Sequence, residues 1–98
     1  MSEWKFAHTE KAECFAQLSH FSMTQKQGDR EIEFVITVKE YANPQDPAMP
    51  FFAIADKQTN QKTMPFTPCG WGNSLLKALS ECMRAVRRFP YEGEEPKP

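Results

Sequence analysis

The clearest pattern of apolar and polar positions lies at residues 73–89. At about 100° per residue the apolar side chains fall on one half of a helical wheel and the polar ones on the other, which predicts an amphipathic helix of about four turns. Asn73 or Ser74 supplies its N-cap, and Pro90 ends it. The apolar half holds Leu75, Leu76, Leu79, Cys82, Met83, Val86 and Phe89, and the polar half holds Lys77, Ser80, Glu81, Arg84, Arg87 and Arg88.

Alternation with a period of two predicts strands in the middle of the chain. Residues 31–41 form the clearest strand, and residues 51–56 are short, aromatic and β-branched enough for a second. Residues 62–67 read as a returning strand, which Pro65 confines to a sheet edge because proline cannot donate to a ladder. A stiff proline-rich excursion, residues 42–50, joins the first two strands. The buried face of the first strand would hold Ile32, Phe34, Ile36 and Val38.

Residues 9–21 fit two structures. Read as a helix, which we favour, they cluster Cys14, Phe15, Leu18 and Phe21 on one side, with Thr9 as a cap. Read as a strand, they would enter the next strand through a hairpin turn at residues 27–29, Gln-Gly-Asp. Trp4 and Phe6 are expected to pack onto the core as an N-terminal extension.

These elements predict an α+β protein: an antiparallel sheet of three to four strands packed by one long C-terminal amphipathic helix. The favoured order is α-β-β-β-α, and the alternative is β-β-β-β-α. We expect residues 1–91 to form a single globular domain, followed by an acidic, proline-containing, disordered tail at residues 92–98.

The favoured order of elements, over roughly residues 9–89, is similar to that of the double-stranded-RNA-binding domain. Its β-β-β-α part also looks like the core of HicB-type antitoxins. The resemblance is one of topology, and the first family implies duplex-RNA binding. That family carries a lysine cluster at the start of its last helix, where this chain has Asn73, Ser74, Leu75, Leu76 and a single lysine, Lys77.

Composition narrows the class of protein. The 98 residues are 40% hydrophobic and 26% charged with a formal net charge of −1, which suits one domain and excludes a general polyanion binder. No apolar run reaches the roughly 18 residues of a membrane span, and the start has no signal-peptide pattern. We therefore expect no membrane partner. Three cysteines, an odd number, favour free thiols and a cytoplasmic protein.

Little in the sequence indicates catalysis. Zinc needs about four ligands at close spacing, which Cys14, Cys69, Cys82 and the two histidines do not offer. No glycine-rich nucleotide cradle is present, so no metal or other cofactor is expected. Cys69, just ahead of the predicted helix, is a weak candidate for a reactive thiol. The prediction is therefore a non-enzymatic protein with no catalytic residues.

Two sets of residues are candidates for binding. Trp71, Phe66 and Met49 place apolar groups in loops that would share one end of the sheet, and interface cores favour such residues. Lys77, Arg84, Arg87 and Arg88 form a basic helix face. The leading hypothesis is a small protein-interaction module, an adaptor, an inhibitor or a homodimer, that uses the loop aromatics and the helix face. The alternative is nucleic-acid binding through the basic face.

Overall fold

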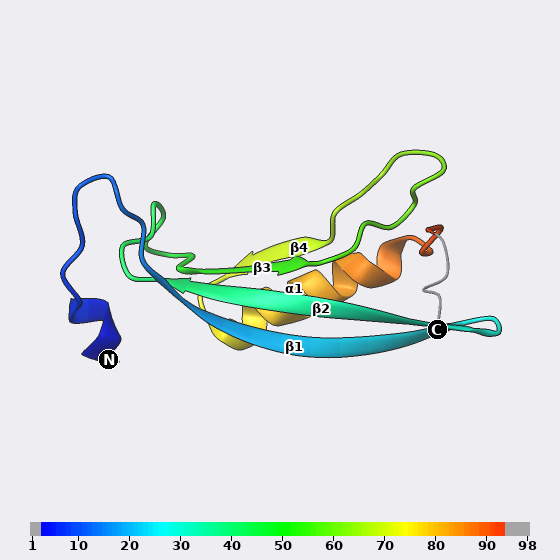
Figure 1. Ribbon diagram of the computed structural model, residues 1–98, viewed down its shortest axis with the longest axis horizontal. Helices are drawn as coiled ribbons and strands as arrows, with labels where there is room; N and C mark the ends of the chain where they lie inside the picture. The colour runs from blue at the N-terminus through cyan, green and yellow to red at the C-terminus, as the bar shows by residue number, and fades with distance from the viewer. Residues whose placement is uncertain (1–2, 94–98) are drawn as a thin grey trace.

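A computed structural model of the chain describes residues 3–93 (Figure 1). Its longest feature is a hairpin of two antiparallel strands, β1 (Ala16–Gln27) and β2 (Arg30–Tyr41), paired residue for residue from Ala16↔Tyr41 to Gln27↔Arg30. Gly28 turns the chain with a φ of 65°, in the left-handed region that glycine enters without strain.

The favoured helix at residues 9–21 is therefore wrong, and with it the α-β-β-β-α order. The alternative β-β-β-β-α order is confirmed. The reason lies in the strand's surroundings, since β1 is an edge strand that has no fully buried residue and is half-buried mainly on its helix side. Its alternation is weak in the sequence, and pairing with β2 rather than local preference determines its structure.

The sheet has four antiparallel strands in the order β1-β2-β3-β4, where β3 is Phe51–Ala55 and β4 is Cys69–Gly72. The returning strand is thus not residues 62–67, as predicted, but Cys69–Gly72. In the predicted segment Phe66 alone makes a bridge, to Thr59. The misplacement has a physical cause: Pro65 and Pro68 lack the N–H groups of a ladder, and continuous pairing begins only after them.

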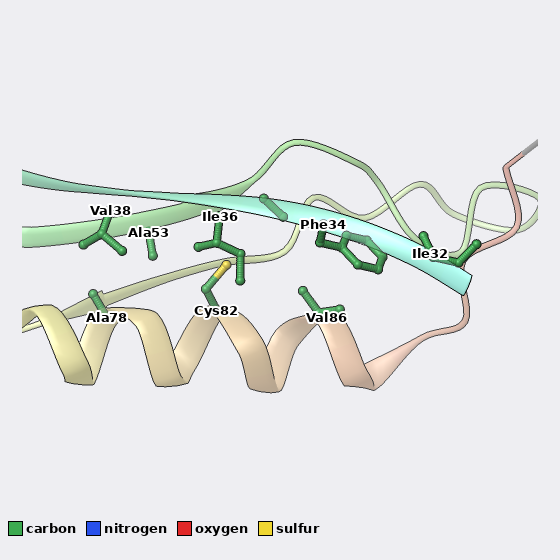
Figure 2. Packing of buried hydrophobic residues seen from close by; sticks show 9 residues of the cluster. Ile32, Phe34, Ile36, Val38, Ala53, Ala78, Cys82 and Val86 are labelled. Carbon is green, nitrogen blue, oxygen red and sulfur yellow. The ribbon is translucent and has the colours of Figure 1, made fainter. Parts of the chain in front are cut away.

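The predicted C-terminal helix is confirmed as α1 (Leu75–Arg88), with Ser74 as its N-cap. The Ser74 side chain accepts a hydrogen bond from the Lys77 N–H at 3.1 Å. The helix lies along one face of the sheet, and the core fills the space between them (Figure 2). No helix in residues 3–93 has the length and apolarity to cross a bilayer. The buried core consists of Ile32, Phe34, Ile36, Val38, Ala53, Ala55, Ala78, Cys82 and Val86.

Two glycines in β4 let the helix approach the sheet closely. A Cβ atom on Gly70 would lie 2.7 Å from the backbone N of Cys82, and one on Gly72 would lie 2.6 Å from the backbone N of Ala78. Both glycines face α1, so Cys69 and Trp71, which alternate with them, face the opposite side of the sheet. The close helix contact thereby determines where Trp71 points.

The two ends of the described chain are held by different contacts. A 3-10 helix, Glu3–Phe6, places Trp4 with its ring centroid 5.7 Å from that of Phe15, whereas Phe6 is 73% exposed. Both residues therefore lie outside the buried core onto which they were expected to pack.

At the other end, Glu92 accepts a hydrogen bond from the Lys62 N–H, and the carbonyl of Gly93 accepts one from Arg30. Of the predicted tail, residues 92 and 93 are thus bonded to the rest of the protein. Residues 94–98 lie outside the described residues.

Candidate interaction surface

The sheet has one face under α1 and one face without a helix, which we call the open face. The register of the strands shows which residues share it, because cross-strand partners point to the same side. One row across the sheet runs Leu18↔Lys39↔Phe52↔Trp71. Leu18 is 51% exposed and Trp71 is 48% exposed, so large apolar groups of the open face are in contact with solvent.

Three aromatic side chains gather at one end of the open face, and we call Tyr41, Phe52 and Trp71 the aromatic cluster. The rings of Phe52 and Trp71 lie 4.5 Å apart between centroids, and Tyr41 stacks on Trp71 at 6.3 Å with 22° between the ring planes. Pairs at these separations are attractive beyond their buried area. The cluster is therefore an ordered, partly exposed apolar surface.

A pocket of about 550 Å³ opens beside the aromatic cluster. One side is built by Tyr41 and Trp71, and the other by the loop after β2, which Asp46 orders. An Asp46 carboxylate oxygen accepts from the Ala48 N–H at 3.0 Å, and the Asp46 carbonyl accepts from the Met49 N–H at 2.9 Å. An apolar or cationic side chain would find aromatic rings and a carboxylate there. The lining residues are Cys14, Tyr41, Asn43, Pro44, Gln45, Asp46, Met49 and Trp71.

The structure brings together two of the three predicted loop residues. Met49 and Trp71 line the same pocket, although Trp71 belongs to β4 and not to a loop. Phe66 lies in the segment between β3 and β4, at the opposite end of the sheet (Figure 1). Its ring packs edge-on against Phe89 at 5.4 Å. The expectation that all three would share one end of the sheet is wrong, because β3 leads the chain away from Met49 before it reaches Phe66, and β4 then leads it back toward Trp71.

The basic helix face is divided among different partners. Glu81 forms ion pairs with Lys77 at 3.2 Å and with Arg84 at 3.4 Å. Hydrogen bonding and charge attraction from Lys77, with a smaller contribution from Arg84, lower the pKa of the Glu81 carboxyl. Lys77 and Arg84 therefore share one carboxylate, which reduces the positive potential they present.

The remaining cations of the helix lie at its C-terminal end. The guanidinium of Arg88 lies 5.7 Å from the ring centroid of Phe66 and 5.6 Å from that of Phe89, within the range of cation–π contact. Arg87 is exposed. This basic face belongs to the helix layer, so a single flat partner could not contact both it and the aromatic cluster.

The thiols occupy different environments. Burial, with a smaller contribution from nearby Cys69, raises the pKa of the Cys82 thiol to about 12, and the thiol donates to the carbonyl of Pro68 at 3.6 Å. Cys69 is exposed, but it lies in β4 on the open face and not in a loop before the helix. His20 is in the same cross-strand row as Cys69 but three strands away, roughly 14 Å. No group of histidine, cysteine and acidic residues in residues 3–93 could hold a metal ion.

Sequence reasoning missed the strand residues of this surface. Tyr41 and Phe52 were not among the predicted binding residues, nor was Cys14, which lines the pocket. A sequence signal for Tyr41 was available. In residues 31–41 the apolar positions assigned to the core are even-numbered, so Tyr41, at an odd position, lies on the other face of the strand. The alternation of glycine with Cys69 and Trp71 in β4 was a second signal.

The order β-β-β-β-α, with one sheet face under a helix and the other open and aromatic, defines the protein as a two-layer α+β protein. Comparison of the chain with protein-family models, with curated proteins and with solved structures gave no match.

Proposed function

We propose that the chain is a non-enzymatic binding module and that the aromatic cluster with its adjoining pocket is the surface that contacts a partner protein. The observation that carries this proposal is Trp71, about half exposed although its ring packs against the rings of Tyr41 and Phe52. Tryptophan and tyrosine dominate the binding energy of protein interfaces, and rigid rings lose little conformational entropy on binding. Such a side chain beside a pocket is suited to accept an apolar group of a partner.

The charges near the cluster favour a protein over a nucleic acid. Lys39 is the single cation of the cross-strand row that contains Phe52 and Trp71. Lys5 is paired with Glu40 at 2.6 Å, and Asp46 lines the pocket. A phosphate backbone needs several unpaired cations along its path, and this surface offers few of them.

Nucleic-acid binding through Lys77, Arg84, Arg87 and Arg88 stays the alternative. Glu81 neutralises part of that face, and Arg88 packs over two rings, which makes it the weaker candidate. We also propose a reducing, cytoplasmic compartment, because Cys14, Cys69 and Cys82 are all free thiols.

Two probes test the partner class. The first is a displayed library of random peptides selected on the immobilised protein, and the second is a fluorescein-labelled 20-nucleotide single strand, followed by fluorescence anisotropy at 50 and 300 mM salt. Each is measured on the wild type, on Trp71→Ala and on Leu76→Ala. Leu76 is a matched control because it is 70% exposed on the helix, away from the open face.

We expect selected peptides whose affinity falls at least about 30-fold in Trp71→Ala, the cost of a hot-spot residue, and stays unchanged in Leu76→Ala. Failure to select any Trp71-dependent peptide would contradict the proposal. Binding of the labelled strand that disappears at 300 mM salt would instead assign the protein to nucleic-acid binding. Loss of that binding in Arg84→Glu with Arg88→Glu would then locate it on the helix.

A further inference from the structure

The outer edge of β1 is a second feature that the proposed function does not use. Within residues 3–93 β1 pairs with β2 alone, and its other side is the edge of the sheet (Figure 1). The strand is 12 residues long, contains no proline, and pairs with β2 without a bulge. Natural proteins usually shorten, charge or cover such an edge, because its free N–H and C=O groups accept another strand. The opposite edge, β4, has only 4 residues and packs against α1.

The hydrogen bonds around β2 show which groups of β1 face outward. The Ala42 N–H donates to the Phe15 carbonyl at 2.9 Å, and bonded pairs alternate along an antiparallel ladder. Odd-numbered residues of β1 therefore bond to β2. Within residues 17–27, the even-numbered residues direct their N–H and C=O groups away from the sheet: Leu18, His20, Ser22, Thr24 and Lys26.

We propose that a second copy of this chain pairs with this edge, β1 antiparallel to β1, with Ser22 of each copy on the two-fold axis. This register joins residues 17–27 of the two strands, which is nearly the whole length of β1. The five outward-facing residues then form bonded pairs, with about ten interchain hydrogen bonds in all. That number is typical of a specific protein interface.

The side chains of β1 match in this register. On the helix side Phe21 faces Met23 of the second copy, and both are half-buried residues packed against the core, so the two cores become continuous across the contact. On the open side His20 faces Thr24, and Lys26 faces Leu18. Lys26 is the one residue of β1 carrying a permanent charge, and it meets an uncharged partner. No like charges are therefore opposed between the strands, and an exposed leucine gains cover.

The size of the contact sets its strength. Residues 17–27 span roughly 35–40 Å, and a sheet is about 10 Å thick, so the edge buries on the order of 700–800 Å² in total. Stable interfaces bury about 1,200 Å² or more, and smaller ones belong to weak or transient complexes. We therefore expect a weak, reversible dimer that forms only at high protein concentration.

Sedimentation velocity on the full chain at 5–500 μM tests the dimer, with Ser22→Pro as the disrupting variant. The Ser22 N–H faces outward, so proline removes an interchain donor and no backbone bond to β2. It also removes the exposed hydrogen bond that the Ser22 hydroxyl donates to the Glu33 carboxylate. We expect a concentration-dependent dimer for the wild type and a monomer for Ser22→Pro at 500 μM, with circular dichroism reporting retained folding. Trp71→Ala should still dimerise, so this test and that of the proposed function fail independently. A wild type that stays monomeric at 500 μM overturns the proposal.

Cross-linking tests the register without proline. In a Cys14→Ser, Cys69→Ser background, Ser22→Cys places two thiols on the axis, with Cα atoms about 5.5 Å apart and within reach of a disulfide. The matched control, Thr24→Cys, puts its thiols about 14 Å apart, beyond that reach. In a glutathione redox buffer we expect covalent dimer from Ser22→Cys only. Equal cross-linking of both variants, or of neither, overturns the proposed pairing.

Discussion

Replacing Gly70 by alanine tests the close contact of α1 with β4. The added Cβ would lie 2.7 Å from the Cys82 backbone N and from the Glu81 Cβ, and 2.8 Å from the Ala78 carbonyl oxygen. Real Cβ atoms essentially never lie within 3.0 Å of such neighbours. Two of these three atoms belong to the helix backbone, so no side-chain rotation can relieve the contact. The helix itself has to move away from the strand.

The size of the effect follows from that displacement. Moving the contacts from 2.7 Å to an ordinary van der Waals separation of 3.4 Å requires roughly 0.7 Å of movement. Ala53 and Ala78 are both fully buried, so the movement would disturb a packed region. Overpacking of this kind costs about 1–3 kcal/mol. Alanine offsets about 0.5–1 kcal/mol of it, since glycine loses more backbone entropy in a strand. Because the contacts are with helix backbone, the upper half of that cost applies, about 2–3 kcal/mol, and we expect a net loss of about 1–2.5 kcal/mol of unfolding free energy.

Urea unfolding followed by circular dichroism measures this loss, and a thermal melt should show a midpoint lower by about 4–20 °C. Cys69→Ala is the matched control, because Cys69 is the neighbouring strand residue on the open face, and it should change stability by no more than about 0.5 kcal/mol. If Gly70→Ala is as stable as the wild type, the helix does not lie at the distance described, and this contact does not direct Trp71 outward.

Three further changes probe the core. Phe34→Ala removes a fully buried ring and should lower the urea-derived free energy of unfolding by about 3–5 kcal/mol; a loss below 1 kcal/mol would contradict its central place. Because the pKa of Cys82 rises from 9.0 to about 12 on folding, the unfolded state ionises first, so stability should fall by about 1.4 kcal/mol per pH unit between those values, with a shallower decline in Cys82→Ala. Equal slopes would mean that the thiol ionises freely in the folded protein. Thr59→Val should raise the melting temperature, since the buried Thr59 hydroxyl has no partner among the described residues, and a lower value would indicate a hydrogen bond to it.

Elements with a strong period were predictable from the sequence. Residues 73–89 gave α1 because one half of the wheel is apolar, and residues 31–41 gave β2 because its even positions are buried against that helix. The turn at Gly28 was also readable, because glycine is suited to its positive φ. Each of these signals is local, so no knowledge of the packing partner is needed.

The elements that depend on partners were not predictable in the same way. β1 has apolar residues on both sides, since Leu18 lies on the open face and Phe21 toward the helix, and that spacing resembles a helical pattern. β4 is shorter than most strands and half glycine, so its propensity is poor. It forms because Gly70 and Gly72 fit closely under α1, and this packing is a tertiary contact that the local sequence does not show. The binding surface was predicted only in part for the same reason. Trp71 could be chosen because tryptophan is common in interfaces, whereas its ring contact with Phe52 depends on the register of β3 and β4.

The two proposed surfaces are compatible, and together they have a consequence that neither has alone. A two-fold axis through Ser22, perpendicular to the sheet, would join two sheets edge to edge and leave both open faces on the same side. Each aromatic cluster lies in a row that ends on β4, so the two clusters would stand at opposite ends of one eight-stranded surface. A partner with two binding segments would then engage both, and its apparent affinity should rise by about 10²–10⁴ over one segment. Ser22→Pro would remove that gain while leaving the affinity for a single peptide unchanged, which separates loss of the dimer from damage to the cluster.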